Sequence, residues 1–167
     1  MIFLTMEQEM NQMYRRIAEA VNAMIPEKWV KFYMYAQVSE TGGGTYFFYN
    51  TPEEEFNYKY SIEIPLEFNI NKEQFKQKER NLFELSDKLR KVFTDYKQEV
   101  WYSFTLSLED NGKFKIHYDY TNWFDTNYSF DDQLIIWEYK YLGNEPDDVE
   151  SKELIERYLN EYPDNPI

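Results

Sequence analysis

The side chains in this sequence that could do chemistry are almost all carboxylates, because the chain has one histidine and no cysteine. Covalent catalysis needs a nucleophile beside a base of tuned pKa, and a zinc site needs several histidine or cysteine ligands. The single histidine, His117, alternates with the apolar Ile116 and Tyr118, which predicts that it faces solvent from one side of a strand. We therefore expect no catalytic residue and no cofactor.

Six aspartates form the strongest candidate for a binding site, and all lie in the last third of the chain: Asp119, Asp125, Asp131, Asp132, Asp147 and Asp148. Carboxylates can hold Mg²⁺ or Mn²⁺ and activate water, so one hypothesis is a carboxylate-metal hydrolase. Residues 145–150, however, lack the alternating ligands and central glycine of an EF-hand, and a solvated loop that enters a helix explains them better. We expect no bound metal and assign the six aspartates to contacts with a partner.

The charge of the chain is distributed unevenly along the sequence. The formal net charge is −13, of which residues 1–71 carry −5, residues 72–98 carry +3 and residues 99–167 carry −11. An anionic surface repels nucleic acid and acidic membranes and attracts basic proteins by long-range steering. The plain alternative is that the charge only keeps the protein soluble. We expect no direct binding to nucleic acid or membranes and favour a basic protein as partner.

Tyrosines are abundant, with 16 in the chain, and six of them are expected on exposed faces of the elements: Tyr33, Tyr35, Tyr46, Tyr49, Tyr139 and Tyr141. Such tyrosines can simply cover a sheet, or they can supply interface area at low entropic cost. Carboxylates combined with tyrosines also imitate a nucleic-acid backbone with its bases. A basic nuclease would be a matching partner for such a surface.

Four segments have the apolar period of a helix, and capping or turn residues mark their ends. Thr5 with Gln8 forms a capping box before the first segment. Asn71 caps the second, which is long and carries the only basic face of the chain, and Gly143 ends the third. The predicted helices span residues 5–24, 71–96, about 129–142 and 151–161.

Five further segments alternate apolar and polar residues as strands do. Three glycines at 42–44 predict the tight turn of one hairpin, and because no Gly-Lys-Ser or Gly-Lys-Thr follows them, they do not indicate a phosphate loop. Residues 110–112 predict the turn of a second hairpin. Trp29 and Trp137 lie in apolar runs and are expected in or beside the core. The predicted strands span residues 29–40, 45–50, 58–64, 102–108 and 114–120.

The order of these elements, α-β-β-β-α-β-β-α-α, predicts the α+β class: an antiparallel sheet of about five strands with helices packed mainly on one face. No repeat or linker divides the chain, so we expect a single domain over residues 1–167, with one core and with residues 1–5 as a flexible lead-in. The lack of cysteine points to a reducing compartment, and no segment approaches the roughly 18 apolar residues of a membrane helix. We expect a soluble, cytoplasmic protein.

Four stretches of the sequence carry a resemblance to a known family. They are residues 17–29, the strand Tyr33-Met34-Tyr35-Ala36-Gln37-Val38, residues 112–120 and, most specifically, Ile135-Ile136-Trp137-Glu138-Tyr139-Lys140-Tyr141-Leu142-Gly143. Over nearly all of residues 6–162 the chain resembles the YezG/EsaG-type immunity proteins, which are antitoxins found in Gram-positive bacteria beside secreted polymorphic toxins.

The resemblance implies an immunity protein that binds and neutralises a cognate toxin inside the producing cell by stoichiometric protein-protein inhibition. The implied toxin is the nuclease domain of a type VII or LXG-type secreted toxin. No catalytic or contact residues come with the resemblance, so the assignment of the six aspartates depends on charge and patterning alone. The alternatives are the carboxylate-metal hydrolase and a structural interaction domain without a toxin partner.

Overall fold

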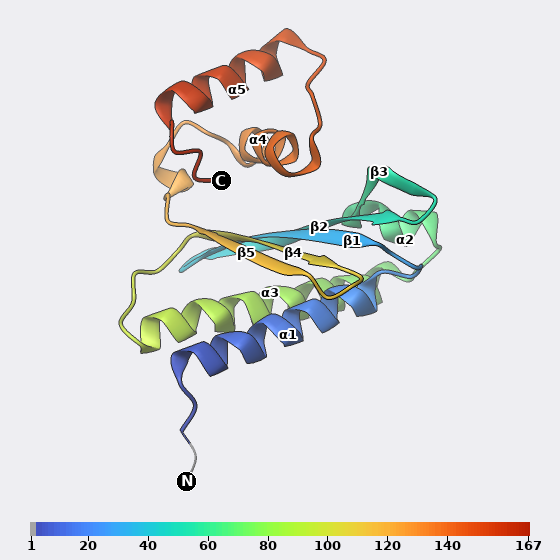
Figure 1. The fold of residues 1–167 in the computed structure, drawn as a ribbon, viewed down its shortest axis with the longest axis vertical. Helices are drawn as coiled ribbons and strands as arrows, with labels where there is room; N and C mark the ends of the chain where they lie inside the picture. Colours follow the sequence, from blue (N-terminus) through green and yellow to red (C-terminus); the bar gives the residue numbers. More distant parts are fainter. Residues whose placement is uncertain (1–2) are drawn as a thin grey trace.

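A computed structural model describes residues 3–167 as three layers, with an antiparallel sheet between two layers of helices (Figure 1). The sheet has five strands in the order β3-β2-β1-β4-β5. The strands are β1 (Lys31–Ser39), β2 (Gly42–Thr51), β3 (Glu54–Tyr60), β4 (Ser103–Glu109) and β5 (Phe114–Asp119). The helices are α1 (Met6–Met24), α2 (Ile64–Glu67), α3 (Lys72–Asp95), α4 (Phe130–Leu142) and α5 (Val149–Glu161), with the 3-10 turns η1 (Ser61–Glu63) and η2 (Trp123–Asp125).

The predicted α+β class, the antiparallel five-stranded sheet and the order of the longer elements are confirmed. The predicted lead-in over residues 1–5 falls partly on residues 1 and 2, which lie outside the described residues. Among residues 3–167, no helix combines the length and apolar character needed to cross a membrane.

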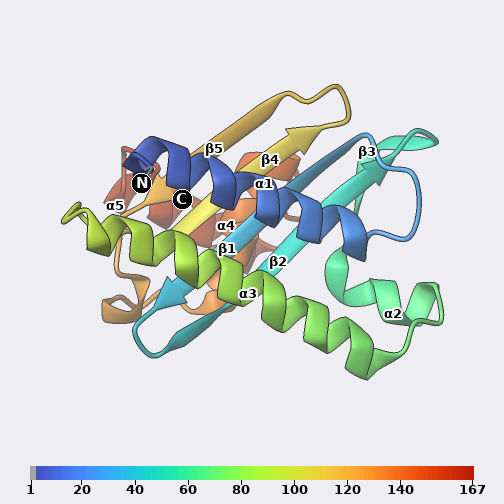
Figure 2. The same cartoon turned by 90° about the horizontal axis from the view of Figure 1, so that it is seen from below.

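The helices cover both faces of the sheet, which corrects the prediction that they pack mainly on one face. Helices α1 and α3 lie across one face, as Figure 2 shows from below, and α4 and α5 lie over the other. Each face has its own apolar cluster, so the expected single core is in fact two. Strand β1 serves both, because Phe32 and Met34 point towards α1 and α3 whereas Tyr33 and Tyr35 point towards α4.

Local signals in the sequence explain where most elements begin and end. The Thr5–Gln8 capping box starts α1, the Asn71 side chain caps α3, and Gly143 ends α4 in a left-handed conformation. Helix α5 begins at Val149, two residues before the predicted Ser151, because the Asp148 side chain caps it.

The third strand is shorter than predicted. It ends at Tyr60, and Ile62 and Ile64 belong to η1 and α2 instead. Pro65 is tolerated in the first turn of α2, where its missing N–H has no helical partner, so it begins a helix rather than ending a strand.

The two tryptophans lie where the sequence places them. Trp137 is fully buried against the sheet, stacked on Tyr35 with ring centroids 5.6 Å apart, and its indole N–H donates to Thr105 Oγ1 at 2.8 Å. Trp29 is half-buried and packs edge-on against Phe32. Trp137 therefore attaches α4 to the centre of the sheet.

Candidate functional site

Asp119 is buried, with 2% of its surface exposed, which contradicts the surface position that its predicted contact role requires. Its Oδ2 accepts a hydrogen bond from Trp123 Nε1 at 2.7 Å, and its Oδ1 accepts one from the Thr121 backbone N–H at 2.9 Å. Burial raises the pKa of this carboxyl, although both hydrogen bonds act in the opposite direction. The side chain faces the α4–α5 layer, and its role there is structural.

The other five predicted aspartates lie in the layer that covers the upper face of the sheet in Figure 1. Residues 122–167, which form this layer, contain 3 Lys and Arg against 12 Asp and Glu, a net charge of −9. Helices α1 and α3 on the opposite face contain 9 basic and 8 acidic residues. The sheet thus separates a strongly anionic layer from a nearly neutral one.

A groove of about 660 Å³ opens in the anionic layer between α4, α5 and the segment before α4. We call it the acidic groove; it is lined by Asn127, Asp132, Ile135, Asp148, Glu150, Ser151, Glu153, Leu154 and Arg157. Four carboxylates face one guanidinium in this lining. An anionic groove of this kind suits a cationic ligand group.

Two of the predicted aspartates line this groove, and both also cap helices. Asp132 Oδ2 accepts from the Ser129 backbone N–H at 3.0 Å at the start of α4, and Asp148 Oδ2 accepts from the Ser151 N–H at 2.8 Å at the start of α5. The Ser151 backbone hydrogen bond holds the pKa of Asp148 below its usual range. Negative charge at a helix N-terminus is favourable, so both carboxylates also stabilise the helices that they cap.

The remaining predicted aspartates lie in the same layer but do not line the groove. Asp125 is exposed in η2 and accepts a hydrogen bond from Asn122 Nδ2, Asp131 is exposed in the first turn of α4, and Asp147 is exposed in the loop before α5. The groove instead contains Glu150 and Glu153, which sequence reasoning missed. Their spacing of three residues would have placed them on one helix face if the start of α5 had been predicted correctly.

No group of three or more His, Asp or Glu side chains within residues 3–167 is arranged to hold a metal ion. Asp132 and Asp148, two of the four carboxylates of the acidic groove, accept hydrogen bonds at helix ends, and Asp119 accepts from Trp123 and Thr121. No observation of this structure favours the carboxylate-metal hydrolase over a binding protein.

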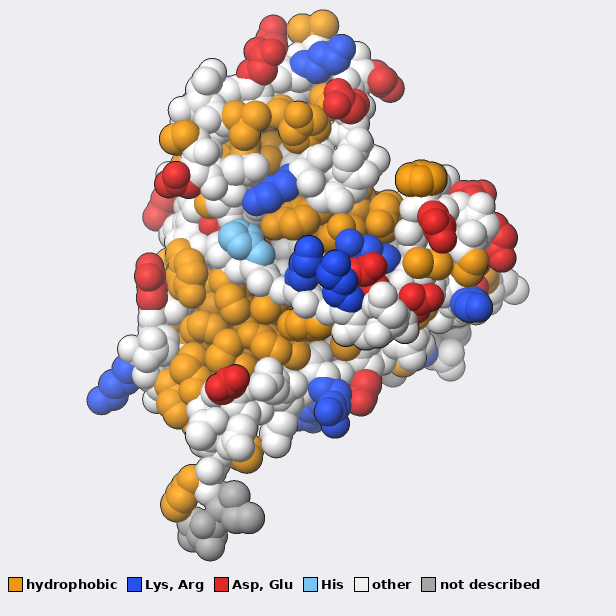
Figure 3. Space-filling model, viewed as in Figure 1, with side chains coloured by type: hydrophobic (Ala, Val, Ile, Leu, Met, Phe, Trp, Pro, Cys, Tyr) orange, Lys and Arg blue, Asp and Glu red, His pale blue; other side chains and the backbone are white. Residues whose placement is uncertain are grey.

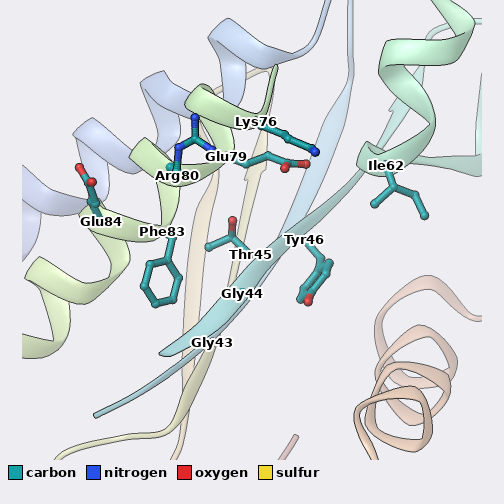
Figure 4. A pocket seen from close by; sticks show the side chains of 10 residues that line it. All are labelled: Gly43, Gly44, Thr45, Tyr46, Ile62, Lys76, Glu79, Arg80, Phe83 and Glu84. Atoms are coloured by element: carbon teal, nitrogen blue, oxygen red, sulfur yellow. The ribbon is translucent and has the colours of Figure 1, made fainter. Parts of the chain in front are cut away.

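A second cavity, of about 750 Å³, lies between β2 and α3 (Figure 4). Phe83, Tyr46 and Ile62 give it apolar walls, and Lys76 and Glu79 extend from α3 across it. Burial raises the pKa of Glu79, and this is opposed by the positive charges of Lys76 and Arg80. Its charged side chains are of both signs, so it does not provide a surface of one charge.

The tyrosines are less exposed than predicted. Tyr35 and Tyr49 are buried, and Tyr33, Tyr46 and Tyr141 are half-buried, which leaves Tyr139 as the one of the six that is exposed. Tyr33 and Tyr141, for example, pack with ring centroids 5.9 Å apart between the sheet and α4. These rings mainly join the two layers, so the candidate interface is defined by its carboxylates more than by its aromatic groups.

The sequence of this chain is similar to those of known proteins over most of its length. A family model described as immunity protein YezG-like matches residues 10–156, which include the sheet and parts of both helical layers. The chain is 35% identical over 150 residues to the immunity protein YezG of Bacillus subtilis (strain 168), covering 90% of this chain and 99% of the relative. It is 27% identical over 161 residues to the type VII secretion system protein EsaG of Staphylococcus aureus (strain NCTC 8325 / PS 47), covering 95% and 98%.

Proposed function

From the premise that the chain belongs to the YezG-like immunity protein family, we propose that it binds a cognate toxin and neutralises it as a stoichiometric inhibitor. The observation that carries the mechanism is the segregation of charge by layer, with a net −9 on the α4–α5 side of the sheet. A basic protein that approaches this molecule is attracted to one face only. The acidic layer is therefore the proposed contact surface.

The acidic groove is the centre of this surface. Asp132, Asp148, Glu150 and Glu153 line it, and a basic side chain of the toxin that enters it would meet several carboxylates at once. The flanking Asp125, Asp131 and Asp147 extend the negative field around it. Asp119 is excluded from the contact set because it is buried.

Charge and one relative support a proposal for the kind of toxin. A nuclease domain needs basic groups to bind phosphates, so it carries a surface complementary to the acidic layer. One relative is named as a type VII secretion system protein, which supports assigning the toxin to that export route. The assignment to the LXG type comes from the family resemblance alone. The complex would then form in the cytoplasm of the producing cell, before export.

The test uses the full chain and its cognate toxin. Increasing amounts of the chain are added to the purified toxin domain while nuclease activity is measured, and activity should fall linearly to zero at a 1:1 ratio. A variant with Asp131→Asn, Glu150→Gln and Glu153→Gln should require an excess of protein. Inactivation at far below a 1:1 ratio, or no inhibition at all, would rule out the proposal.

Calorimetric titration of the chain alone with Mg²⁺ and Mn²⁺ serves as the control for the hydrolase alternative. We expect neither binding heat nor hydrolysis of nucleic acid. Metal-dependent turnover that disappeared in the same triple variant would favour the hydrolase instead.

A further inference from the structure

A third cavity differs in charge from the rest of this acidic molecule. It measures about 420 Å³ and lies on the α4 side of the sheet, over β4 and β5. We call it the basic pocket; its lining residues are Lys31, Tyr33, Thr105, Ser107, Lys115, Ile116, His117 and Tyr141. We infer that this pocket binds the carboxylate of an aspartate or glutamate side chain of a protein partner.

The register of the sheet places side chains of the pocket next to one another. Ser107 in β4 lies opposite Lys115 in β5, and Thr105 lies opposite His117, so these four side chains project from the same face. Helix α4 covers the neighbouring part of that face, where Trp137 packs on the sheet, but leaves Lys115 and His117 exposed. The acidic layer borders this pocket rather than closing it: Tyr141 forms part of the wall, and His117 Nε2 lies 2.7 Å from the backbone oxygen of Pro166.

The lining contains two lysines and a histidine but no Asp or Glu, in a chain whose net charge is −13. Figure 3 shows lysine or arginine side chains close to the histidine, between the upper and lower layers. Within residues 3–167, neither Lys31 nor Lys115 takes part in an ion pair. Glu109 lies opposite Lys31 in the register, but its ion pair is with Lys113. Two ammonium groups are thus available to an anionic ligand.

Polar groups at the floor can complete the coordination of a carboxylate. The hydroxyls of Ser107 and Thr105 belong to residues that are only 6% and 5% exposed. Trp137 Nε1 donates to Thr105 Oγ1 and holds that side chain in place. Lys31 Nζ lies 4.5 Å from the centre of the Tyr33 ring, which keeps its stem along the pocket wall. A carboxylate accepts up to about four hydrogen bonds, which these donors and Lys115 can supply.

The charge of the whole molecule selects a single carboxylate over a nucleic acid. A nucleic-acid strand would bring many phosphates against a chain of net charge −13 and its adjoining acidic layer. An acidic side chain on an otherwise basic protein brings one negative charge to a pocket whose charged side chains are basic. That the carboxylate belongs to a protein partner rests on the proposed function, whereas the preference for a carboxylate rests on the pocket's own charges.

The single histidine provides a direct readout, because the imidazole signals in an NMR spectrum of the full chain come from His117 alone. The chain is titrated with a blocked glutamate, N-acetyl-glutamate N-methylamide, and with the corresponding blocked glutamine. We expect saturable shifts of the His117 signals with the glutamate compound and at least tenfold weaker binding of the glutamine compound, equivalent to about 1.4 kcal/mol.

Matched variants separate the pocket from general charge effects. Lys115→Gln and Lys31→Gln should each weaken binding of the glutamate compound several-fold, whereas Lys152→Gln, which removes the same charge from α5, should not. Equal binding of both compounds, insensitivity to Lys115→Gln, or tighter binding of a short single-stranded oligonucleotide than of the glutamate compound would overturn the inference. If the chain still inhibits the toxin at a 1:1 ratio in that case, the inference about the pocket is wrong but the proposed function stands.

Discussion

Trp123 donates its indole N–H to the Asp119 carboxylate at 2.7 Å, and this contact joins the end of β5 to η2, the first turn of the acidic layer. The second Asp119 oxygen accepts the Thr121 N–H, so both oxygens are used. Asp119→Asn replaces one acceptor by a donor and leaves a buried N–H unpaired, which should lower the free energy of unfolding by about 1 to 3 kcal/mol. Chemical denaturation measures this loss, and the exposed Asp125→Asn should be close to wild type.

The pH dependence of stability provides a second test of Asp119. Burial raises its folded pKa, so between the unfolded and folded values the folded chain holds a proton that the unfolded chain has released. Stability from this group is therefore present at low pH and is lost as pH rises from about 3.9 through the folded pKa. The difference in unfolding free energy between wild type and Asp119→Asn isolates this group, because the other carboxylates contribute equally to both proteins. It should grow as pH falls from about 7 to about 4.5, and a shrinking difference would contradict the raised pKa.

Trp137→Ala should be the most damaging single truncation in the upper layer. The side chain is fully buried between Tyr35, Phe48 and Tyr141, and its removal leaves a cavity and deprives Thr105 of a donor. We expect a loss of about 3 to 5 kcal/mol, a large part of the total stability of a typical domain. Trp29→Ala, at a half-buried site, should cost less. Equal thermal midpoints for the two variants would show that α4 is not held by Trp137.

Association with the toxin should depend on salt and on which face is altered. The screening length falls from about 30 Å at 0.01 M to about 8 Å at 0.15 M, so the association rate should drop markedly over this range while dissociation changes less. Neutralising Asp131, Glu150 and Glu153 should slow association more than neutralising the three exposed glutamates at 53–55, which lie at the end of the β2–β3 turn and the start of β3. Stopped-flow measurements on both triple variants decide this. A larger effect of the 53–55 variant would place the contact surface elsewhere.

Gly43 should tolerate substitution worse than Gly112. Gly43 has φ +155°, and a Cβ there would lie 1.9 Å from the backbone oxygen of Gln37 on the paired strand. Gly112, with φ +91°, has open space around its missing Cβ. Gly112→Ala should therefore cost about 1 kcal/mol from backbone strain alone, and Gly43→Ala clearly more, because β1 and β2 must also separate. Thermal unfolding of the two variants provides the comparison.

Elements defined by neighbouring residues were predictable from the sequence. The cap of α1 joins Thr5 to Gln8, and the stop of α4 needs only a residue that accepts a left-handed conformation, which Gly143 provides. Such signals act within one turn of chain, so no knowledge of the rest of the fold is needed. The start of α5 was missed because Asp148 is both a loop carboxylate and a helix cap, and the sequence does not distinguish the two roles.

Burial on the second face of the sheet was not predictable in the same way. Alternation along β1 shows that Tyr33 and Tyr35 share a face, but not that α4 covers it. The same limit explains Asp119, which was predicted as a surface contact residue but is buried. The alternation along a strand shows which side chains share a face of the sheet. Only the packing of a later segment determines whether that face is covered.

By itself the sequence determined the elements, the net charge and the resemblance to a family, because each of these resides in residue types and short spacings. Tertiary structure decided that most of the net negative charge occupies one layer, that Asp132 and Glu153 face one groove, and that Lys31 and Lys115 line one basic pocket. These features join residues from separate elements, and their positions depend on strand register and on which face each helix covers. Both are set by burial of apolar surface across the whole chain, which no local pattern contains.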